Sequence, residues 1–301
     1  MFGRNLDVEF SYNEKIIFMP RKLSTGFAIM GLGTVIDGKP LFYDAVNEHG
    51  LYIAALNFPK SAAYFPEKAE QTNIASFEFI RYVLSRCSSV TEAEKLLKNA
   101  NITDENFSEE LKNTPLHWFI ADKKSAITAE PLSTGFTVYK NEIGVLTNEP
   151  PFDFHLKNLS NYTNLSPYEA ENKFSKNLIT EPFSRGSGAF GLPGDFSSPS
   201  RFIKAAFVKE NSLCSESEED FVTQFFHILS SVSMPRGSVR LDKGELEHTL
   251  CSTCATEDGK YYFRTYQNSR ICVLDIKKEH LDSSVLKIYP VFYPQDFAVL
   301  N

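Results

Sequence analysis

The chain has 301 residues, of which 42% are hydrophobic, 13% aromatic and 23% charged, and its formal net charge is −7. This is ordinary globular composition, with ample length for a sizeable core. The acidic balance, with no basic block, argues against nucleic acid as a partner, and no apolar run approaches the roughly 20 residues that would span a membrane.

The first part of the chain predicts a series of strands. Apolar runs bounded by glycine, proline or charged residues are expected to be extended. They lie at residues 8–20, 27–33, 41–46 and 51–58. Residues 21–26 read as a polar loop and residues 47–50 as a turn. The run at 51–58 is apolar on both faces, so we expect it at the centre of a sheet that is covered on both sides.

Two helices are predicted next. Apolar residues recur at helical spacing from Ile74 to Leu84. Ser89 and Glu92 form a capping box ahead of a second amphipathic segment that runs to Ala100. Two adjacent amphipathic helices would together cover one face of a sheet.

The second half of the chain repeats this order. Strands are predicted at residues 116–121, 126–130, 137–140 and 143–146. Residues 151–200 are rich in Asn, Ser, Pro and Gly and read as a long loop. Helices are expected to begin near Pro199 and at Ser217. The chain then returns to strands at residues 249–255, 261–266 and 271–276, with a hairpin at Asp258-Gly259.

This order predicts an α+β protein in which helix pairs pack outside two stacked sheets. No internal repeat, low-complexity tract or linker divides the sequence. We therefore expect a single domain over residues 1–301.

The cysteines predict neither a disulfide framework nor a metal centre. They are odd in number, and no signal peptide precedes them, so reduced thiols and a cytoplasmic location are expected. They lie at Cys87, Cys214, Cys251, Cys254 and Cys272. The pair at 251 and 254 has CxxC spacing but falls in a predicted strand, and a zinc site would need a second ligand pair. No cofactor and no metal are predicted.

The N-terminal segment carries an arginine and an aspartate three positions apart. Strand alternation places Arg4 and Leu6 on one face, with Asn5 and Asp7 on the other. A bend after Asn5, which Gly3 would permit, would let Arg4 and Asp7 converge on one pocket. The alternative is an exposed pair of charges on a frayed terminus.

Seven blocks across the chain resemble one known family. In order they read FGRNLDVEFSYNEKIIFMPR, NEHGLYIAALNFP, NTPLHWFIAD, GVLTNEPPFDFHLKNL, GLPGDFSSPSRF, FFHIL and YYFRTYQN. Together they are similar to the choloylglycine hydrolase family, which includes the bile salt hydrolases and the penicillin V acylases. The resemblance implies a four-layer αββα sandwich, the fold of the N-terminal nucleophile (Ntn) hydrolases.

The resemblance also implies a set of site residues. Arg4 matches the family's active-site arginine, which positions the thiolate. Asp7 matches the family's aspartate, which contacts the amine of the nucleophile. Asn57 matches the oxyanion-hole position, Asn148 the other active-site asparagine and Arg201 a site arginine. Asparagine at 57 favours bile salts, because penicillin V acylases often have tyrosine there. Taken alone, such asparagines usually cap their own backbone and such arginines usually join surface ion pairs.

One departure from the family concerns the nucleophile. Members begin Met-Cys, followed by a strand; the cysteine becomes the first residue, and its own amine, with an ordinary pKa of about 7.7–8.0, shuttles the proton. This sequence starts at Met1-Phe2, directly at the FGRN block, so the fold is expected to lack the first strand.

We therefore expect an amidase that releases glycine or taurine from conjugated bile acids, with its cysteine encoded just upstream. The alternatives are a catalytically inactive protein that binds bile acids or other amphipathic anions on the same fold, and a penicillin V acylase. The resemblance further implies a homotetramer.

Overall fold

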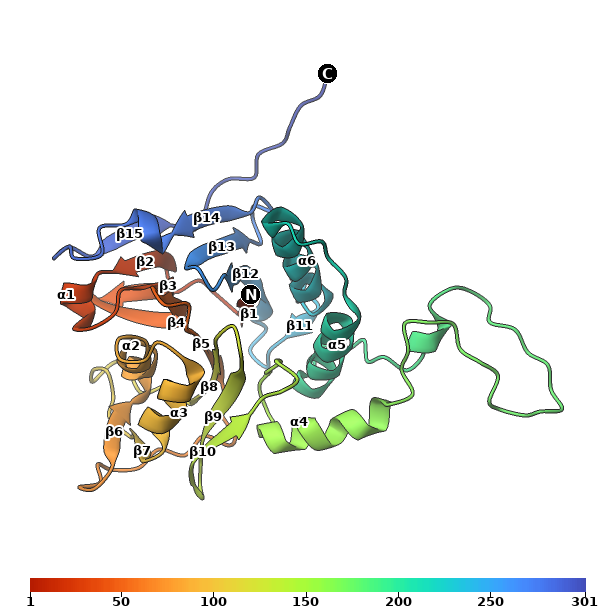
Figure 1. Ribbon diagram of the computed structural model, residues 1–301, viewed down its shortest axis with the longest axis horizontal. Coiled ribbons are helices and arrows are strands. Elements are labelled where there is room, and N and C mark those ends of the chain that lie inside the picture. The colour runs from red at the N-terminus through yellow and green to blue at the C-terminus, as the bar shows by residue number, and fades with distance from the viewer. The chain divides into compact units, whose positions relative to one another are not determined.

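The computed structural model describes all 301 residues and divides into two compact units. Unit 1 comprises Met1–Gly144 and Ser233–Asn301, and unit 2 comprises Val145–Val232. Figure 1 shows that unit 1 holds the sheets, whereas unit 2 is built from helices and long connections. That the whole chain forms one domain stays a prediction.

Unit 1 contains an eight-stranded antiparallel sheet in the order β10-β9-β8-β5-β4-β3-β2-β15. β5 lies inside the sheet, as its two apolar faces predict. The strands are β2 (Lys15–Met19), β3 (Ile29–Ile36), β4 (Lys39–Asn47), β5 (Tyr52–Asn57), β8 (Leu116–Ala121), β9 (Ala126–Leu132), β10 (Gly135–Lys140) and β15 (Lys287–Pro290).

The second sheet of unit 1 has five strands, with the path β1-β12-β13-β14 and β11 paired to β12. β1 therefore forms an edge of the sheet. Gly259 adopts φ 90° in the turn between β12 and β13, where the sequence predicts a hairpin. The strands are β1 (Phe2–Val8), β11 (Val239–Arg240), β12 (Leu246–Ala255), β13 (Lys260–Thr265) and β14 (Cys272–Asp275).

Side chains on β2 show why the larger sheet is covered on both faces. Ile16 and Phe18 belong to a core cluster shared with Leu6 of β1 and other residues of the smaller sheet. Ile17 and Met19 point the other way, into a cluster shared with the helices. Because successive side chains of a strand point to opposite faces, one continuous apolar run contributes side chains to two separate cores.

Helices α2 (Phe79–Leu84) and α3 (Val90–Leu97) cover the outer face of the eight-stranded sheet. The sequence predicted this pair. At the start of α3 the Ser89 side chain accepts a hydrogen bond from the Glu92 amide at 3.4 Å. The Glu92 carboxylate accepts from the amide of Ser88 at 2.7 Å, so three residues, Ser88, Ser89 and Glu92, take part in the cap.

Replacing Ser89 by alanine is expected to lower the free energy of unfolding by about 1 kcal/mol, because one amide at the start of α3 loses its side-chain acceptor. Urea denaturation would measure the loss. Ser88→Ala is the matched control: it keeps the backbone amide that Glu92 accepts from, so its effect should be smaller. Equal losses in the two variants would contradict the assignment of Ser89 as the cap.

Unit 2 contains α4 (Phe152–Asn158), α5 (Ser198–Asn211) and α6 (Glu218–Ser231), with α5 packed on α6. Pro199 lies in the first turn of α5, and Ser217 caps α6 by accepting from the Asp220 amide at 3.1 Å. Both starts agree with the sequence prediction. None of the helices is long and apolar enough to cross a membrane.

Several local predictions are wrong. The loop at 21–26 contains a short helix, α1 (Arg21–Ser24), and no strand forms at 143–146. The predicted first helix begins late, because Thr72–Ala75 is the strand β6, paired in parallel with β7 (Ala100–Thr103). The long loop at 151–200 includes α4. In these segments, contacts with distant parts of the chain, such as the pairing of β6 with β7, outweigh the local spacing of apolar residues.

Candidate active site

Arg4 lies on β1 and reaches across to the larger sheet. Its Nη1 donates to the carbonyl oxygens of Ala55 at 2.5 Å and Tyr43 at 3.2 Å, and its Nε donates to the Asn5 carbonyl at 3.1 Å. Leu6, two residues on, is buried in the core between the sheets. Arg4 and Leu6 therefore share the inward face, as strand alternation predicts, and the guanidinium is held in place by backbone acceptors.

Asp7 follows a break in the pairing of β1 with β12. Leu6 is opposite Cys251 but Asp7 is opposite Thr249, so the register shifts between Leu6 and Asp7. Asp7 accepts a hydrogen bond from the Thr249 hydroxyl at 2.5 Å. The irregularity therefore re-aims the aspartate at this point, a common use of bulges beside functional sites. The alternative of a frayed terminus does not hold, since β1 is paired along its whole length.

Asn57 ends β5 and is exposed. Its place relative to Arg4 follows from the chain: Ala55, which accepts from Arg4, is two residues before Asn57 on the same strand. Residues two apart on a strand lie on the same face about 6–7 Å apart. Arg4 therefore contacts the backbone of β5 two residues before Asn57, while the Ala55 side chain, and by alternation that of Asn57, belongs to the face that packs on the helices.

A buried carboxylate lies behind Arg4, between the two sheets. Asp44 of β4 is fully buried and accepts hydrogen bonds from the hydroxyls of Tyr261 and Thr253, the latter at 3.3 Å. Thr253 is also the β12 residue opposite Arg4. Burial raises the pKa of Asp44 from 3.8 to about 6, against the opposing attraction of the Arg4 guanidinium. Sequence reasoning missed this cluster.

Unit 2 holds the other two predicted residues as a direct pair. The Arg201 guanidinium, on α5, donates through Nη2 to Asn148 Oδ1 at 2.7 Å and through Nε to the Phe196 carbonyl at 3.0 Å. The loop before Asn148 is tied to the start of α5, because the Thr147 hydroxyl donates to the Ser198 carbonyl at 3.1 Å. The position of the Asn148 amide therefore depends on Arg201.

An aromatic cluster supports this pair. His155 on α4 is fully buried, stacks on Phe202 of α5 with ring centroids 4.6 Å apart, and lies 3.2 Å through Nε2 from the Asn148 carbonyl oxygen. Phe152 packs edge-on against Phe202. Sequence reasoning did not identify His155 as a supporting residue, because α4 itself was not predicted.

The structure thus groups the five predicted residues by unit. Arg4, Asp7 and Asn57 lie in unit 1, where Arg4 contacts the backbone of β5 two residues before Asn57. Asn148 and Arg201 lie in unit 2 and are hydrogen-bonded to each other. Arg4 is held by backbone carbonyls, Asp7 by a hydroxyl, and Asn148 and Arg201 by each other, which suits a site that must keep charged and polar groups in fixed positions.

The cysteines near these residues are not prepared as nucleophiles. Cys251 and Cys254 are buried on β12, and burial raises the pKa of Cys254 to about 12 and that of Cys251 well above its ordinary value. Burial also raises the pKa of Cys87 to about 11. Because the thiolate is the reactive form, these thiols are inert at neutral pH. The strand interpretation of the CxxC is confirmed.

Comparison with known proteins gives a consistent result. Residues 1–289 match the family described as linear amide C-N hydrolases, choloylglycine hydrolase family. A bile salt hydrolase/transferase from Lactiplantibacillus plantarum is 44% identical over 311 residues, covering 100% of this chain and 96% of that protein. Another, from Clostridium perfringens, is 41% identical over 304 residues, covering 96% of this chain and 92% of that protein.

Solved structures agree. A mutant of the conjugated bile acid hydrolase from Clostridium perfringens matches with a TM-score of 0.92 and 38% identity, covering 99% of this chain and 95% of that one. Penicillin V acylase from Agrobacterium tumefaciens matches with a TM-score of 0.74, covering 97% of this chain and 90% of that one, but at 17% identity this shows the fold alone. The predicted α+β, Ntn-hydrolase fold is confirmed.

Proposed function

The chain belongs to the choloylglycine hydrolase family of linear amide C-N hydrolases, and from this premise we propose that it serves to release glycine or taurine from conjugated bile acids. The observation that carries the proposal is that backbone carbonyls hold the Arg4 guanidinium in a fixed position. The carbonyls are those of Tyr43 and of Ala55, which lies two residues before Asn57 on β5. The relatives named bile salt hydrolase support the choice of substrate.

Each predicted residue has a role in this reaction. Arg4 positions the thiolate of an N-terminal cysteine, and Asp7 holds the amine that shuttles the proton. Asn57 and Asn148 donate to the oxygen that becomes negative in the tetrahedral intermediate. Arg201 fixes the Asn148 amide by donating to its oxygen at 2.7 Å, which leaves the amide nitrogen oriented as a donor.

The nucleophile is placed on a strand ahead of Phe2. β1 is an edge strand, with β12 on one side, so its other edge offers backbone donors and acceptors to a further strand. A strand paired there would run beside Arg4 and bring a cysteine to the same sheet. The inert internal thiols support this placement, since Cys87, Cys251 and Cys254 have raised pKa values.

The choice of substrate is tested by assaying the protein that its native host makes. Glycocholate, taurocholate and penicillin V are offered in parallel, and released amine or acid is quantified. The proposal expects faster release from both bile conjugates than from penicillin V. Faster cleavage of penicillin V would favour the acylase alternative, and no cleavage of any amide would contradict the proposed activity.

The second candidate function is binding without catalysis. The Arg4 guanidinium of unit 1 would still offer positive charge to an amphipathic anion if no nucleophile were supplied. Calorimetry with taurocholate on a protein of residues 1–301 tests this. Saturable binding together with an absence of hydrolysis in the native protein would favour it, whereas hydrolysis would remove it.

We further propose a cytoplasmic homotetramer. Large apolar side chains exposed on the long connection of unit 2 support association, because monomeric proteins rarely expose many such side chains together. They include Tyr168, Phe174, Ile179, Phe183 and Phe190. Sedimentation velocity would measure the oligomeric state; a monomer across the micromolar range would contradict the tetramer.

A further inference from the structure

A polar cavity lies in unit 1, and none of the five predicted site residues lines it. Its volume is about 230 Å³, and its walls come from α2, β6, the end of β7 and the loops beside them. This is below the ~300 Å³ at which pockets for drug-sized ligands begin. The walls are mostly polar or charged, with Ile74 and Ala75 the aliphatic exceptions. The cavity therefore suits a small polar ligand and not a steroid ring.

One wall carries two carboxylates at equivalent positions. Phe65 and Thr103 are partners in a parallel β-bridge, fixed by hydrogen bonds from the Phe65 amide to the Ile102 carbonyl and from the Asp104 amide to the Phe65 carbonyl. Glu67 and Glu105 each follow two residues later. Both are exposed and neither forms a salt bridge. Two negative charges on one wall of the cavity favour a bound cation there.

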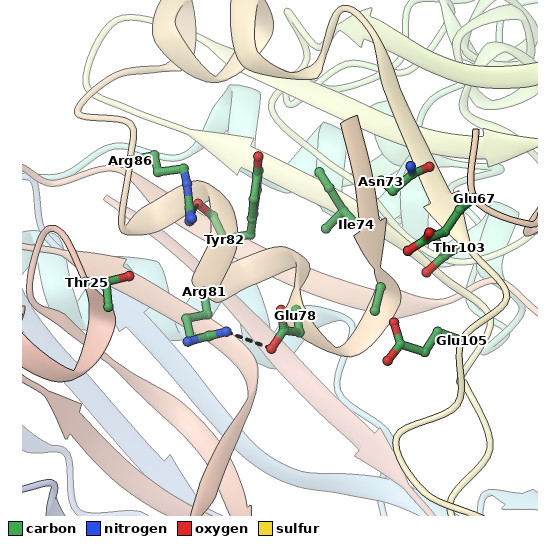
Figure 2. Close-up of a pocket in the computed structure, with 11 residues that line it drawn as sticks. Thr25, Glu67, Asn73, Ile74, Glu78, Arg81, Tyr82, Arg86, Thr103 and Glu105 are labelled. Atoms are coloured by element: carbon green, nitrogen blue, oxygen red, sulfur yellow. Dashed lines mark hydrogen bonds and ion pairs between the residues drawn. The ribbon is translucent and has the colours of Figure 1, made fainter. Parts of the chain in front are cut away.

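The floor beside these carboxylates contains an unpartnered hydroxyl. Thr103 is 3% exposed, lines the cavity, and its Oγ1 has no hydrogen-bond partner. Figure 2 shows Thr103 beside Glu67 and on the same side of the cavity as Glu105. Buried hydroxyls are normally satisfied, so this one marks a place where a ligand would supply the missing partner.

The opposite wall presents a positioned guanidinium. Arg86 stacks on the Tyr82 ring, 4.0 Å from its centroid, and donates to the Tyr82 carbonyl at 3.0 Å and the Ser85 hydroxyl at 2.9 Å. Arg81 also lines the cavity, and its guanidinium is paired with the Glu78 carboxylate at 2.6 Å. Arg86 forms no salt bridge, so its planar fork is open to a carboxylate or sulfonate.

We propose that this cavity binds a short zwitterion of the amino-acid class. Its ammonium group lies between Glu67 and Glu105 and donates to the Thr103 hydroxyl, and its carboxylate or sulfonate lies toward Arg86. The proposal does not depend on amide hydrolysis, since no residue of the proposed reaction is involved.

Titration calorimetry of the chain with taurine and glycine tests the proposal. Methylamine, which carries only the ammonium group, and ethanesulfonate, which carries only the sulfonate, are titrated separately for comparison. Saturable binding of a zwitterion is expected at about 1–10 mM, at the weak end of small-ligand affinity, with each of these single-charge compounds at least about tenfold weaker. Glu67→Gln with Glu105→Gln should weaken the zwitterion at least about tenfold. The matched control is Glu94→Gln with Glu109→Gln, which removes the same charge from exposed positions outside the cavity and should leave affinity unchanged.

Thr103→Val separates binding from folding. It removes a buried hydroxyl that has no partner while keeping the branched shape, so the melting temperature should be unchanged or higher. The affinity for the zwitterion should fall at least about threefold. Equal affinities in the Glu67/Glu105 and Glu94/Glu109 double variants, or no binding of either zwitterion, would overturn the proposal.

Discussion

A chain extended ahead of Phe2 by a strand that begins Met-Cys is expected to hydrolyse glycocholate and taurocholate, and the same extension with alanine in place of the cysteine is not. The reason is that the supporting groups are already held. Arg4 has three carbonyl acceptors, Asp7 is bonded to Thr249, and Arg201 holds Asn148. Removing the nucleophile of a covalent hydrolase costs about 10⁶-fold in kcat, so the difference should be of that order.

The alanine extension is the control because it restores the same strand pairing on the edge of β1 without the thiol. Circular dichroism and the melting temperature should match between the two extended chains, so a difference in activity reports chemistry and not folding. Equal release of glycine or taurine by both would show that another group performs the attack. No release by the cysteine chain, when folded with its first residue exposed, would contradict the proposed mechanism.

Asp44→Asn is expected to raise the free energy of unfolding at pH 7 by about 2–3 kcal/mol. Burial raises the pKa of Asp44 to about 6, which means that the folded protein disfavours the carboxylate by about 3 kcal/mol relative to the acid. Asparagine has the same shape, needs no charge desolvated and keeps an oxygen for the Tyr261 hydroxyl. The lost attraction to Arg4 is the smaller effect, since the raised pKa already includes it.

The same group gives the wild-type protein a pH-dependent stability. Below pH 3.8 the folded and unfolded chains both carry the proton on Asp44, and its contribution is fully present. As pH rises from about 4 to about 6, the unfolded chain ionises first, and about 3 kcal/mol is lost by the time pH passes the folded pKa. Urea denaturation at pH 4.5 and 7 should show about 2 kcal/mol of this loss in wild type beyond any change in Asp44→Asn, because the unfolded chain is already largely ionised at pH 4.5.

Asp44→Ala serves as the control for shape. It also removes the charge, but it leaves the Tyr261 hydroxyl without its carboxylate acceptor and opens a space in the core, so it should be less stable than Asp44→Asn by about 1–3 kcal/mol. If Asp44→Asn is less stable than wild type at pH 7 and keeps the same pH dependence, the ionised carboxylate stabilises the fold and our interpretation is wrong. A costly buried carboxylate beside Arg4 is typical of stability given up for function.

The parts of the fold that depend on local chemistry could be predicted from the sequence. β5 was placed inside a sheet because both its faces are apolar. The starts of α3 and α6 were found from Ser89 and Ser217, whose side chains accept from the first turn. The hairpin before β13 was found from Gly259, which adopts the positive φ that its turn requires.

The parts that depend on distant partners could not be predicted. Ile74 and Ala75 fall in the helix predicted from spacing, yet they belong to β6, which pairs with β7, whose residues lie 28 positions later. Asp44 is one acid in an apolar strand until Thr253 and Tyr261, 209 and 217 residues away, supply its hydrogen bonds. No local pattern encodes such pairings, because they arise only when two sheets stack.

The candidate site divides in the same way. Arg4, Asp7, Asn57, Asn148 and Arg201 were identified by resemblance, and the hydrogen bond between Asn148 and Arg201 was not predicted. The alternation that puts Arg4 on the inward face follows from strand geometry alone, but the register shift that redirects Asp7 does not. Catalytic roles for the five residues stay predictions until variants are assayed.

The measurement that tests the central claim most directly is the identity of the first residue of the protein as its native host makes it, by intact mass and tandem sequencing. We expect a cysteine, followed by one more strand ahead of Phe2. A mature protein that begins at Met1 would lack the nucleophile, would contradict amide hydrolysis by this mechanism and would leave binding of an amphipathic anion as the function.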